Sequence, residues 1–307
     1  MRSLIFFLLF TLSAHAAEAN IDQVSDNEFA FKVGESRLTV EIRDVVLLGK
    51  KDLLLDWVRS SARLVEKYYA RFPVQSVKIA LQVTGGHAVR FGQAFGGESP
   101  FIRIVIGEDI NPEMLKRDWI LVHEMVHLAM ADIPRSHRWF LEGLATYVES
   151  IARAQNGDLA PDFVWNGFIN RMPQGLPKSG DQGLDVTHTW GRTYWGGAIF
   201  CLLADVEIRR ITDNKHSLRD ALRGVLNDGY SMEASTSIRQ VLESADRAIG
   251  VAVLLPLYEK MRADPYPVNL PALWQSLGVS LKNDKVYYDD SAPMSAIRQS
   301  MLSGQSM

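Results

Sequence analysis

The chain has 307 residues, of which 47% are hydrophobic and 22% are charged, and its formal net charge is −3. These values are typical of an ordinary soluble globular protein with one or two domains. Basic residues are not in excess, so nucleic acid is not an expected partner.

The amino terminus has the pattern of a secretory signal. Met1 and Arg2 give a positive start, residues 4–12 are nearly all apolar, and Ala14 and Ala16 form a small-x-small cleavage site. The apolar run is too short to span a membrane comfortably, so we expect no stable membrane insertion after cleavage. The segment 1–16 is therefore predicted to be a signal peptide, and the mature protein to be exported, either periplasmic or secreted.

Residues 17–134 are predicted to form an α+β lobe. Alternating apolar residues predict strands, with a hairpin around Gly34, and one helical stretch has an apolar face. The predicted strands are 28–33, 37–42, 77–83 and 101–106, and the predicted helix is 51–71. This lobe should place a sheet beside the helix that follows.

That next helix carries the most informative motif, HExxH, at His123–His127. Asn111, followed by Pro and Glu, predicts a capped helix start, and apolar residues spaced three or four apart continue to Pro134. Residues four apart share a helix face, so His123 and His127 can direct two imidazoles at one ion. Glu124 lies next to them, within reach of a metal-bound water. The alternative is a core helix with two hydrogen-bonded histidines.

Zinc in a catalytic site takes three protein ligands and leaves one position for water. The nearby choices are Asp132, His137, Glu142 and Glu149. We expect His137 to be a surface residue at the start of the next helix, 136–154. Glu142 lies on the second turn of that helix, and a short connection would fold it back to face the two histidines. Glu149 is two turns further on, too far to share the ion.

HExxH followed by a separate helix carrying Glu-Gly-x-Ala-x-Tyr resembles the gluzincin metallopeptidases, namely the aminopeptidase N, glycyl aminopeptidase and peptidase-MA-like families. The resemblance covers roughly residues 100–225. It implies a thermolysin-like catalytic domain and one zinc ion per chain, bound by His123, His127 and Glu142. It also implies that Glu124 is the general base and that the partner is a peptide or protein substrate. The connection between His127 and Glu142 is shorter than in aminopeptidase N, which indicates a distant relative.

A third segment, 188–205, resembles the glycyl aminopeptidase stretch in which a tyrosine precedes a glycine and a buried helix. The resemblance implies that Tyr194 donates to the developing oxyanion. His188 is a rival for that role, because thermolysin-like sites use a histidine there. The alternative is that Tyr194 and Trp195 are core aromatics at a helix start.

The segment Gly92–Glu98 occupies the place where related aminopeptidases carry a Gly-x-Met-Glu-Asn strand along the substrate. Met-Glu-Asn is missing here, and Glu98 is not in register with its glutamate. One interpretation is a glycine-rich turn, and the other is an edge segment that pairs with an extended peptide. Aminopeptidase and endopeptidase specificity both stay open.

Residues 135–290 are predicted to form a mainly helical lobe that completes the zinc site. The predicted helices are 136–154, 194–211, 215–227, 234–245 and 248–262. Cys201 is the only cysteine and lies among apolar residues, so we expect a buried, inert thiol and no internal disulfide. Residues 291–307 are polar and small, and they predict a disordered tail.

Three functions are consistent with this pattern, and the first is favoured: an exported zinc metallopeptidase. The second is a zinc hydrolase of another amide or ester. The third is a catalytically idle peptide-binding scaffold of the same fold, against which the intact Glu124 argues. The sequence carries no signal for the oligomeric state.

Overall fold

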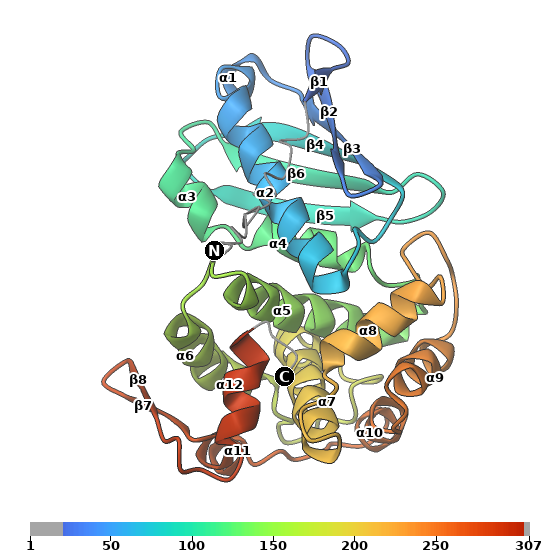
Figure 1. Ribbon diagram of the computed structural model, residues 1–307, viewed down its shortest axis with the longest axis vertical. Helices are drawn as coiled ribbons and strands as arrows, with labels where there is room; N and C mark the ends of the chain where they lie inside the picture. The colour runs from blue at the N-terminus through green and yellow to red at the C-terminus, as the bar shows by residue number, and fades with distance from the viewer. Residues whose placement is uncertain (1–20, 304–307) are drawn as a thin grey trace, which may run out of the picture.

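The computed structural model describes residues 21–303 (Figure 1). The signal peptide expected at 1–16 lies outside this range. Within it, no helix is long and apolar enough to cross a membrane.

The amino-terminal part is built around a six-stranded sheet with the order β1-β2-β3-β4-β6-β5. Its strands are β1 (Asp22–Gln23), β2 (Glu28–Val33), β3 (Ser36–Ile42), β4 (Ser76–Thr84), β5 (Val89–Phe95) and β6 (Phe101–Gly107). β2 and β3 form the predicted antiparallel hairpin, and β3, β4 and β6 run parallel. β5 is antiparallel to β6 and forms one edge of the sheet. The four predicted strands are confirmed.

Helices cover one face of the sheet because apolar side chains alternate with more exposed ones along its strands. Ile102, Ile104 and Ile106 of β6 are buried on one face, while the residues between them are partly exposed. The short α1 (Val45–Leu48) leads into α2 (Lys51–Tyr69), which buries an apolar stripe and lies across the sheet in Figure 1. This packing forms the part of the hydrophobic core that supports the site.

The helix predicted from Asn111 to Pro134 is two shorter helices, so its predicted extent is wrong. α3 (Pro112–Arg117) starts with the predicted Asn111 cap, and α4 (Ile120–His127) holds the motif. Asp118 interrupts the run and caps α4, because its carboxylate accepts from the Ile120 and Leu121 amides, each at 3.1 Å.

The carboxy-terminal part is mainly helical and lies below the sheet in Figure 1. α5 (Arg138–Gln155) runs through its centre and packs on both α4 and α7. The remaining elements are α6 (Pro161–Arg171), α7 (Gly197–Ile211), α8 (Leu218–Asn227), α9 (Ile238–Ile249), α10 (Leu254–Met261), α11 (Leu270–Leu277), β7 (Val279–Lys282), β8 (Lys285–Tyr288) and α12 (Ser295–Ser303). Cys201 is buried in α7.

The disordered tail predicted from residue 291 is wrong for Ser295–Ser303, which form α12. Its apolar residues Ile297 and Met301 are buried. The guanidinium of Arg298 donates to the backbone carbonyls of Leu277 and Gly278 at the end of α11, and this contact anchors α12. Composition alone misses this helix because a few buried side chains are enough to hold it.

Candidate metal centre

α4 places two histidines on one side. His123 and His127 are four residues apart, and their rings lie 4.9 Å apart between centroids. His123 is buried, and the first turn of α4 is held by Asp118. Because both imidazoles belong to one short helix, their separation is fixed by the helix itself.

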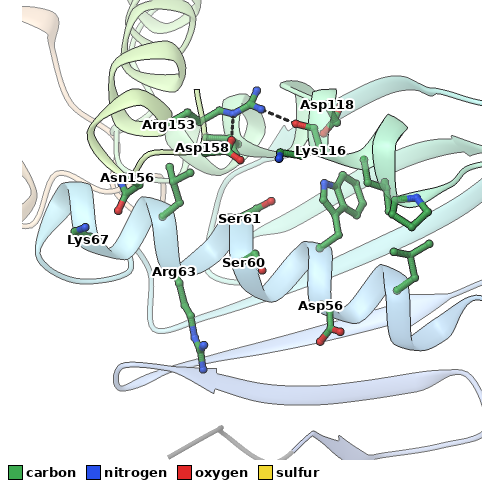
Figure 2. Close-up of a pocket in the computed structure, with 16 residues that line it drawn as sticks. Asp56, Ser60, Ser61, Arg63, Lys67, Lys116, Asp118, Arg153, Asn156 and Asp158 are labelled. Atoms are coloured by element: carbon green, nitrogen blue, oxygen red, sulfur yellow. Dashed lines mark hydrogen bonds and ion pairs between the residues drawn. The ribbon is translucent and has the colours of Figure 1, made fainter. Parts of the chain in front are cut away.

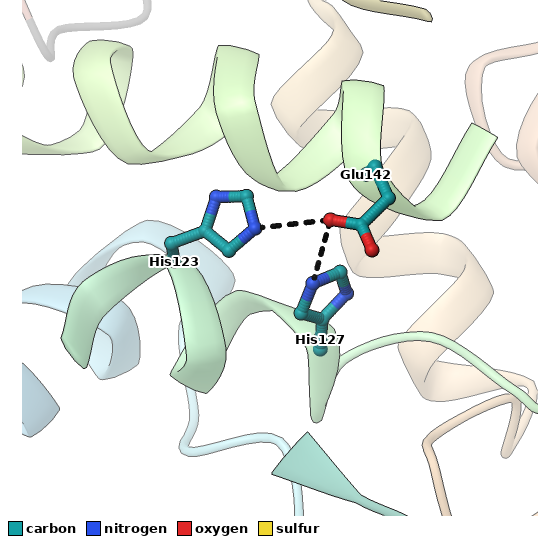
Figure 3. Close-up of side chains that lie close together, drawn as sticks. All are labelled: His123, His127 and Glu142. Carbon is teal, nitrogen blue, oxygen red and sulfur yellow. Dashed lines mark hydrogen bonds and ion pairs between the residues drawn. The ribbon is translucent and has the colours of Figure 1, made fainter. Parts of the chain in front are cut away.

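α5 brings Glu142 to the same point. Its Oε2 lies 3.3 Å from His123 Nε2 and 3.6 Å from His127 Nε2, as Figure 3 shows. Ligand atoms about 2.1 Å from a tetrahedral ion lie about 3.4 Å from one another. Three donors of the kind zinc prefers therefore converge at the spacing that zinc needs, so the residues present fit this metal.

Two glycines let α5 come close enough for this convergence. A Cβ on Gly143 would lie 2.2 Å from Gly197 Cα, and one on Gly197 would lie 2.0 Å from the carbonyl oxygen of Trp139. The backbones of α5 and α7 therefore touch directly, which only glycine permits. This contact seats the helix that carries Glu142.

The charges around the cluster favour an ionised carboxylate. Burial acts to raise the pKa of Glu142, but the hydrogen bond with His123 and the nearby imidazole of His127 outweigh it and hold that pKa well below its usual range. Arg138 donates to Glu142 Oε1 at 3.1 Å, which leaves Oε2 directed at the histidines. Arg138 was missed in the sequence, although its position four residues before Glu142 on one helix was a usable signal.

Glu124 lies beside the cluster and is not one of the three grouped donors. Its Oε2 accepts a hydrogen bond of 2.8 Å from the backbone amide of Ala94 on β5. Burial raises the pKa of this carboxyl, while His127 and the Ala94 amide act in the opposite direction. A turn and an edge segment were both open for Gly92–Glu98, and its first four residues, 92–95, form the end of the edge strand β5, which is held against Glu124.

Gly92 is required where β5 meets α4. For the hydrolase activity that the sequence predicts, we expect Gly92→Ala to lower kcat/KM by about 10²-fold, since an ångström of misplacement costs that much. A Cβ at this position would lie 2.5 Å from Ile120 Cγ2 and 2.6 Å from Glu124 Cγ. The control is Gly167→Ala on α6, where no atom lies within 4 Å. Steady-state kinetics of the two variants with their zinc contents would decide, and unchanged kinetics for Gly92→Ala would refute the assigned contact.

Tyr194 also reaches the cluster, from a π-helical turn, Arg192–Gly196, that leads into α7. Its ring stacks on His123 with centroids 6.3 Å apart, and burial together with the charge of Glu142 raises the pKa of its hydroxyl, while Arg138 acts in the opposite direction. Such π-turns are frequent at functional sites. The rival residue His188 is exposed and precedes this turn.

The other acidic and histidine candidates point elsewhere. His137 Nδ1 contacts Asp185 Oδ1 at 2.9 Å, and Asp185 also accepts from Trp139 and Tyr258. His137 is therefore held at the start of α5 and does not join the cluster. Asp132 is exposed beyond α4, and Glu149 pairs with Arg153 at 2.8 Å.

A cavity of about 600 Å³ lies between α2, α3 and the end of α5 (Figure 2). None of the three grouped donors lines it. Arg153 at its wall is already bonded to Glu149, Asp158 and the Lys116 carbonyl. The cavity is therefore separate from the metal centre, and the guanidinium of Arg153 is already occupied by protein partners.

No protein-family model and no curated protein matches the sequence. Among solved structures, an aminopeptidase N family protein from Idiomarina loihiensis matches with a TM-score of 0.62 at 12% identity, over 86% of this chain and 50% of that chain. An M1 zinc metallopeptidase from Deinococcus radiodurans, in a mutant form bound to a Tyr-Ser-Ala substrate, matches with a TM-score of 0.49 at 13% identity, over 83% of this chain and 54% of that chain.

The chain shares the fold of this Idiomarina loihiensis protein. At 12% identity, the match to the Idiomarina loihiensis structure carries the fold alone, and the chain spans about half the length of these solved structures. The predicted α+β class, with an amino-terminal sheet and a helical carboxy-terminal part, is confirmed. Within this fold, the donor cluster lies between the two parts, on α4 and α5.

Proposed function

We propose that the protein is a zinc-dependent metallopeptidase of the gluzincin type, with the thermolysin-like arrangement of HExxH and a distant glutamate. The observation that carries this proposal is the convergence of His123, His127 and Glu142, with Glu124 held beside them by β5. A scaffold without activity would have no need of a buried carboxylate fixed next to a zinc-type donor set.

One zinc ion per chain would be held by His123, His127 and Glu142. When bound, it would polarise a substrate carbonyl and lower the pKa of a water molecule. Glu124 would accept the proton of the attacking water and later deliver it to the leaving amine. The Tyr194 hydroxyl would donate to the oxyanion that develops on the carbonyl oxygen.

The substrate we propose is an extended peptide laid along β5. The Ala94 amide points away from β6 and toward Glu124, and in an antiparallel ladder Gly92 faces the same way. The unpaired edge of the sheet therefore runs past the proposed base. A peptide that pairs with this edge would bring its carbonyl carbons to the metal centre in regular steps.

Two measurements on the purified full chain test the proposal. We expect about one zinc per chain by elemental analysis, and cleavage of a mixed peptide library, followed by mass spectrometry, that a chelator stops and added zinc restores. Zinc binding with cleavage of esters or small amides but no peptides would favour the second function. Absence of zinc after careful reconstitution would refute the enzyme and leave the scaffold.

Tyr194→Phe is expected to lower kcat by about 10²-fold, because it removes one donor to the oxyanion, while zinc content stays unchanged. The phenyl ring keeps the stacking on His123 and loses only the hydroxyl. The control is His188→Ala, which tests the rival residue. A larger loss in the His188 variant than in the Tyr194 variant would reverse the assignment.

We also propose that the protein is exported, on the pattern of residues 1–16. Sequencing the amino terminus of the mature protein should give a start after Ala16. Protein recovered with Met1 still attached would contradict export through cleavage at this site.

A further inference from the structure

Two half-exposed tryptophans flank the metal centre. The chain has seven tryptophans, and the large exposed hydrophobic side chains include only Trp119 and Trp190 of them, with exposed fractions of 50% and 60%. Trp119 immediately precedes α4, and Trp190 precedes the π-helical turn. The two residues are 71 positions apart in the sequence, so only the fold brings both to one site.

Ring contacts join them through the site itself. Trp119 meets His123 edge-on, with ring centroids 5.4 Å apart, and Trp190 stacks on Tyr194 with centroids 5.6 Å apart. Tyr194 in turn stacks on His123. The result is a continuous row, Trp119–His123–Tyr194–Trp190, with a proposed zinc ligand and the proposed oxyanion donor in the middle and an indole at each end.

Solvent exposure of two indoles here calls for an explanation. Four of the seven tryptophans, Trp139, Trp165, Trp195 and Trp274, are buried in the core, and exposed apolar surface beside a polar site is typical of ligand recognition. Aromatic rings bind one another at roughly 4.5–7 Å between centroids. The two indoles lie at such distances from His123 and Tyr194, the two site residues in the row. The side chains next to the scissile bond of a substrate held at the metal centre would therefore lie within contact distance of one indole or the other.

The ligand chemistry at this row is apolar. The row offers ring faces and edges, and Tyr194 is its one member with a hydroxyl group. The edge strand Val89–Phe95 carries no carboxylate of its own. Recognition at this place is thus suited to a hydrophobic side chain, with no acidic group on the strand to hold a free amino terminus.

We propose that Trp119 and Trp190 are specificity-determining residues that bind large apolar or aromatic side chains next to the scissile bond. This inference rests on the proposed peptidase function and adds the substrate class. The expected substrates are peptides with residues such as Phe or Leu beside the cleaved bond, in contrast to peptides of Gly and Ala.

Calorimetric titration on the zinc-loaded full chain tests this without relying on turnover. The probes are acetyl-phenylalanine hydroxamic acid and acetyl-glycine hydroxamic acid, which share the metal-binding group and differ only in the benzyl side chain. We expect the wild type to bind the phenylalanine probe about tenfold tighter or more, since one aromatic contact in a desolvated site gives this order of preference. Trp119→Ala and Trp190→Ala should each reduce the preference and leave binding of the glycine probe unchanged.

Phe163→Ala is the matched control, because Phe163 is 66% exposed on α6 and makes no ring contact with the row. It should keep the full preference. Trp119→Phe should keep most of it, which separates loss of the aromatic contact from disturbance of α4, and zinc content is measured for every variant.

Equal affinity of the wild type for both probes, or a preference that survives loss of both tryptophans, would overturn the inference while leaving the peptidase intact. Zinc-loaded protein that binds neither probe would overturn the inference together with the proposed function. In that case the exposed indoles would serve contact with another macromolecule.

Discussion

Glu124→Gln is expected to lower kcat by about 10³-fold, within the range of about 10²–10⁴ that a positioned general base contributes. Glutamine has nearly the same volume as glutamate, and its amide oxygen can still accept from the Ala94 amide that lies 2.8 Å from Glu124 Oε2. It cannot accept a proton from water. The fold, the β5 contact and the metal ligands should therefore all survive, and only the proton transfer should be lost.

The measurement pairs kcat on a peptide identified by the library screen with zinc content of the same preparation. Glu98→Gln is the matched control, because Glu98 is an exposed carboxylate after β5 and should not affect turnover. Glu124→Gln protein with normal zinc and normal kcat would exclude Glu124 as the base. Loss of zinc in this variant would instead assign the residue to the metal.

His127→Ala is expected to abolish stoichiometric zinc binding and, with it, peptide cleavage. The replacement leaves two donors, His123 and Glu142, whose facing atoms lie 3.3 Å apart. Even indirect partners of zinc ligands cost about 10–100-fold in metal affinity when removed, and loss of a direct ligand should exceed this. The carboxylate of Glu142 keeps its contact with Arg138, so its charge remains paired and the fold should persist.

The control is His137→Ala, which removes a histidine at the start of α5 that pairs with Asp185 outside the cluster. We expect it to keep about one zinc per chain. Metal analysis after dialysis, with circular dichroism to verify folding, distinguishes the two variants. Equal zinc in His127→Ala and wild type would rule out the proposed ligand set, and equal loss in both would point to a general effect on folding.

The sequence determined the local parts of this protein. Alternation of apolar residues set β2, β3, β4 and β6, and the Asn111 cap set the start of α3. The spacing of HExxH placed two imidazoles on one helix face, because a helix repeats about every 3.6 residues. The position of Glu142 was also predicted from the sequence, because the short connection after α4 makes α5 fold back on α4. These features depend on neighbours in the chain, so a single sequence contains them.

Only the tertiary structure decided which distant side chains meet. From the sequence alone, a glycine-rich turn and an edge segment are both possible at β5. The pairing of β5 with β6 and the hydrogen bond from the Ala94 amide to Glu124 decide for the strand. Nothing in the sequence distinguishes Gly92 and Gly143 from other glycines. In the fold, atoms of a neighbouring helix lie within 3 Å of the place where a Cβ would be at each of them. The composition of residues 295–303 predicts disorder, but these residues form a helix in which Arg298 donates to a backbone carbonyl at the end of α11. Trp119 and Trp190 become one site only when α4 and the π-helical turn come together. Each depends on long-range packing, which local propensity does not encode.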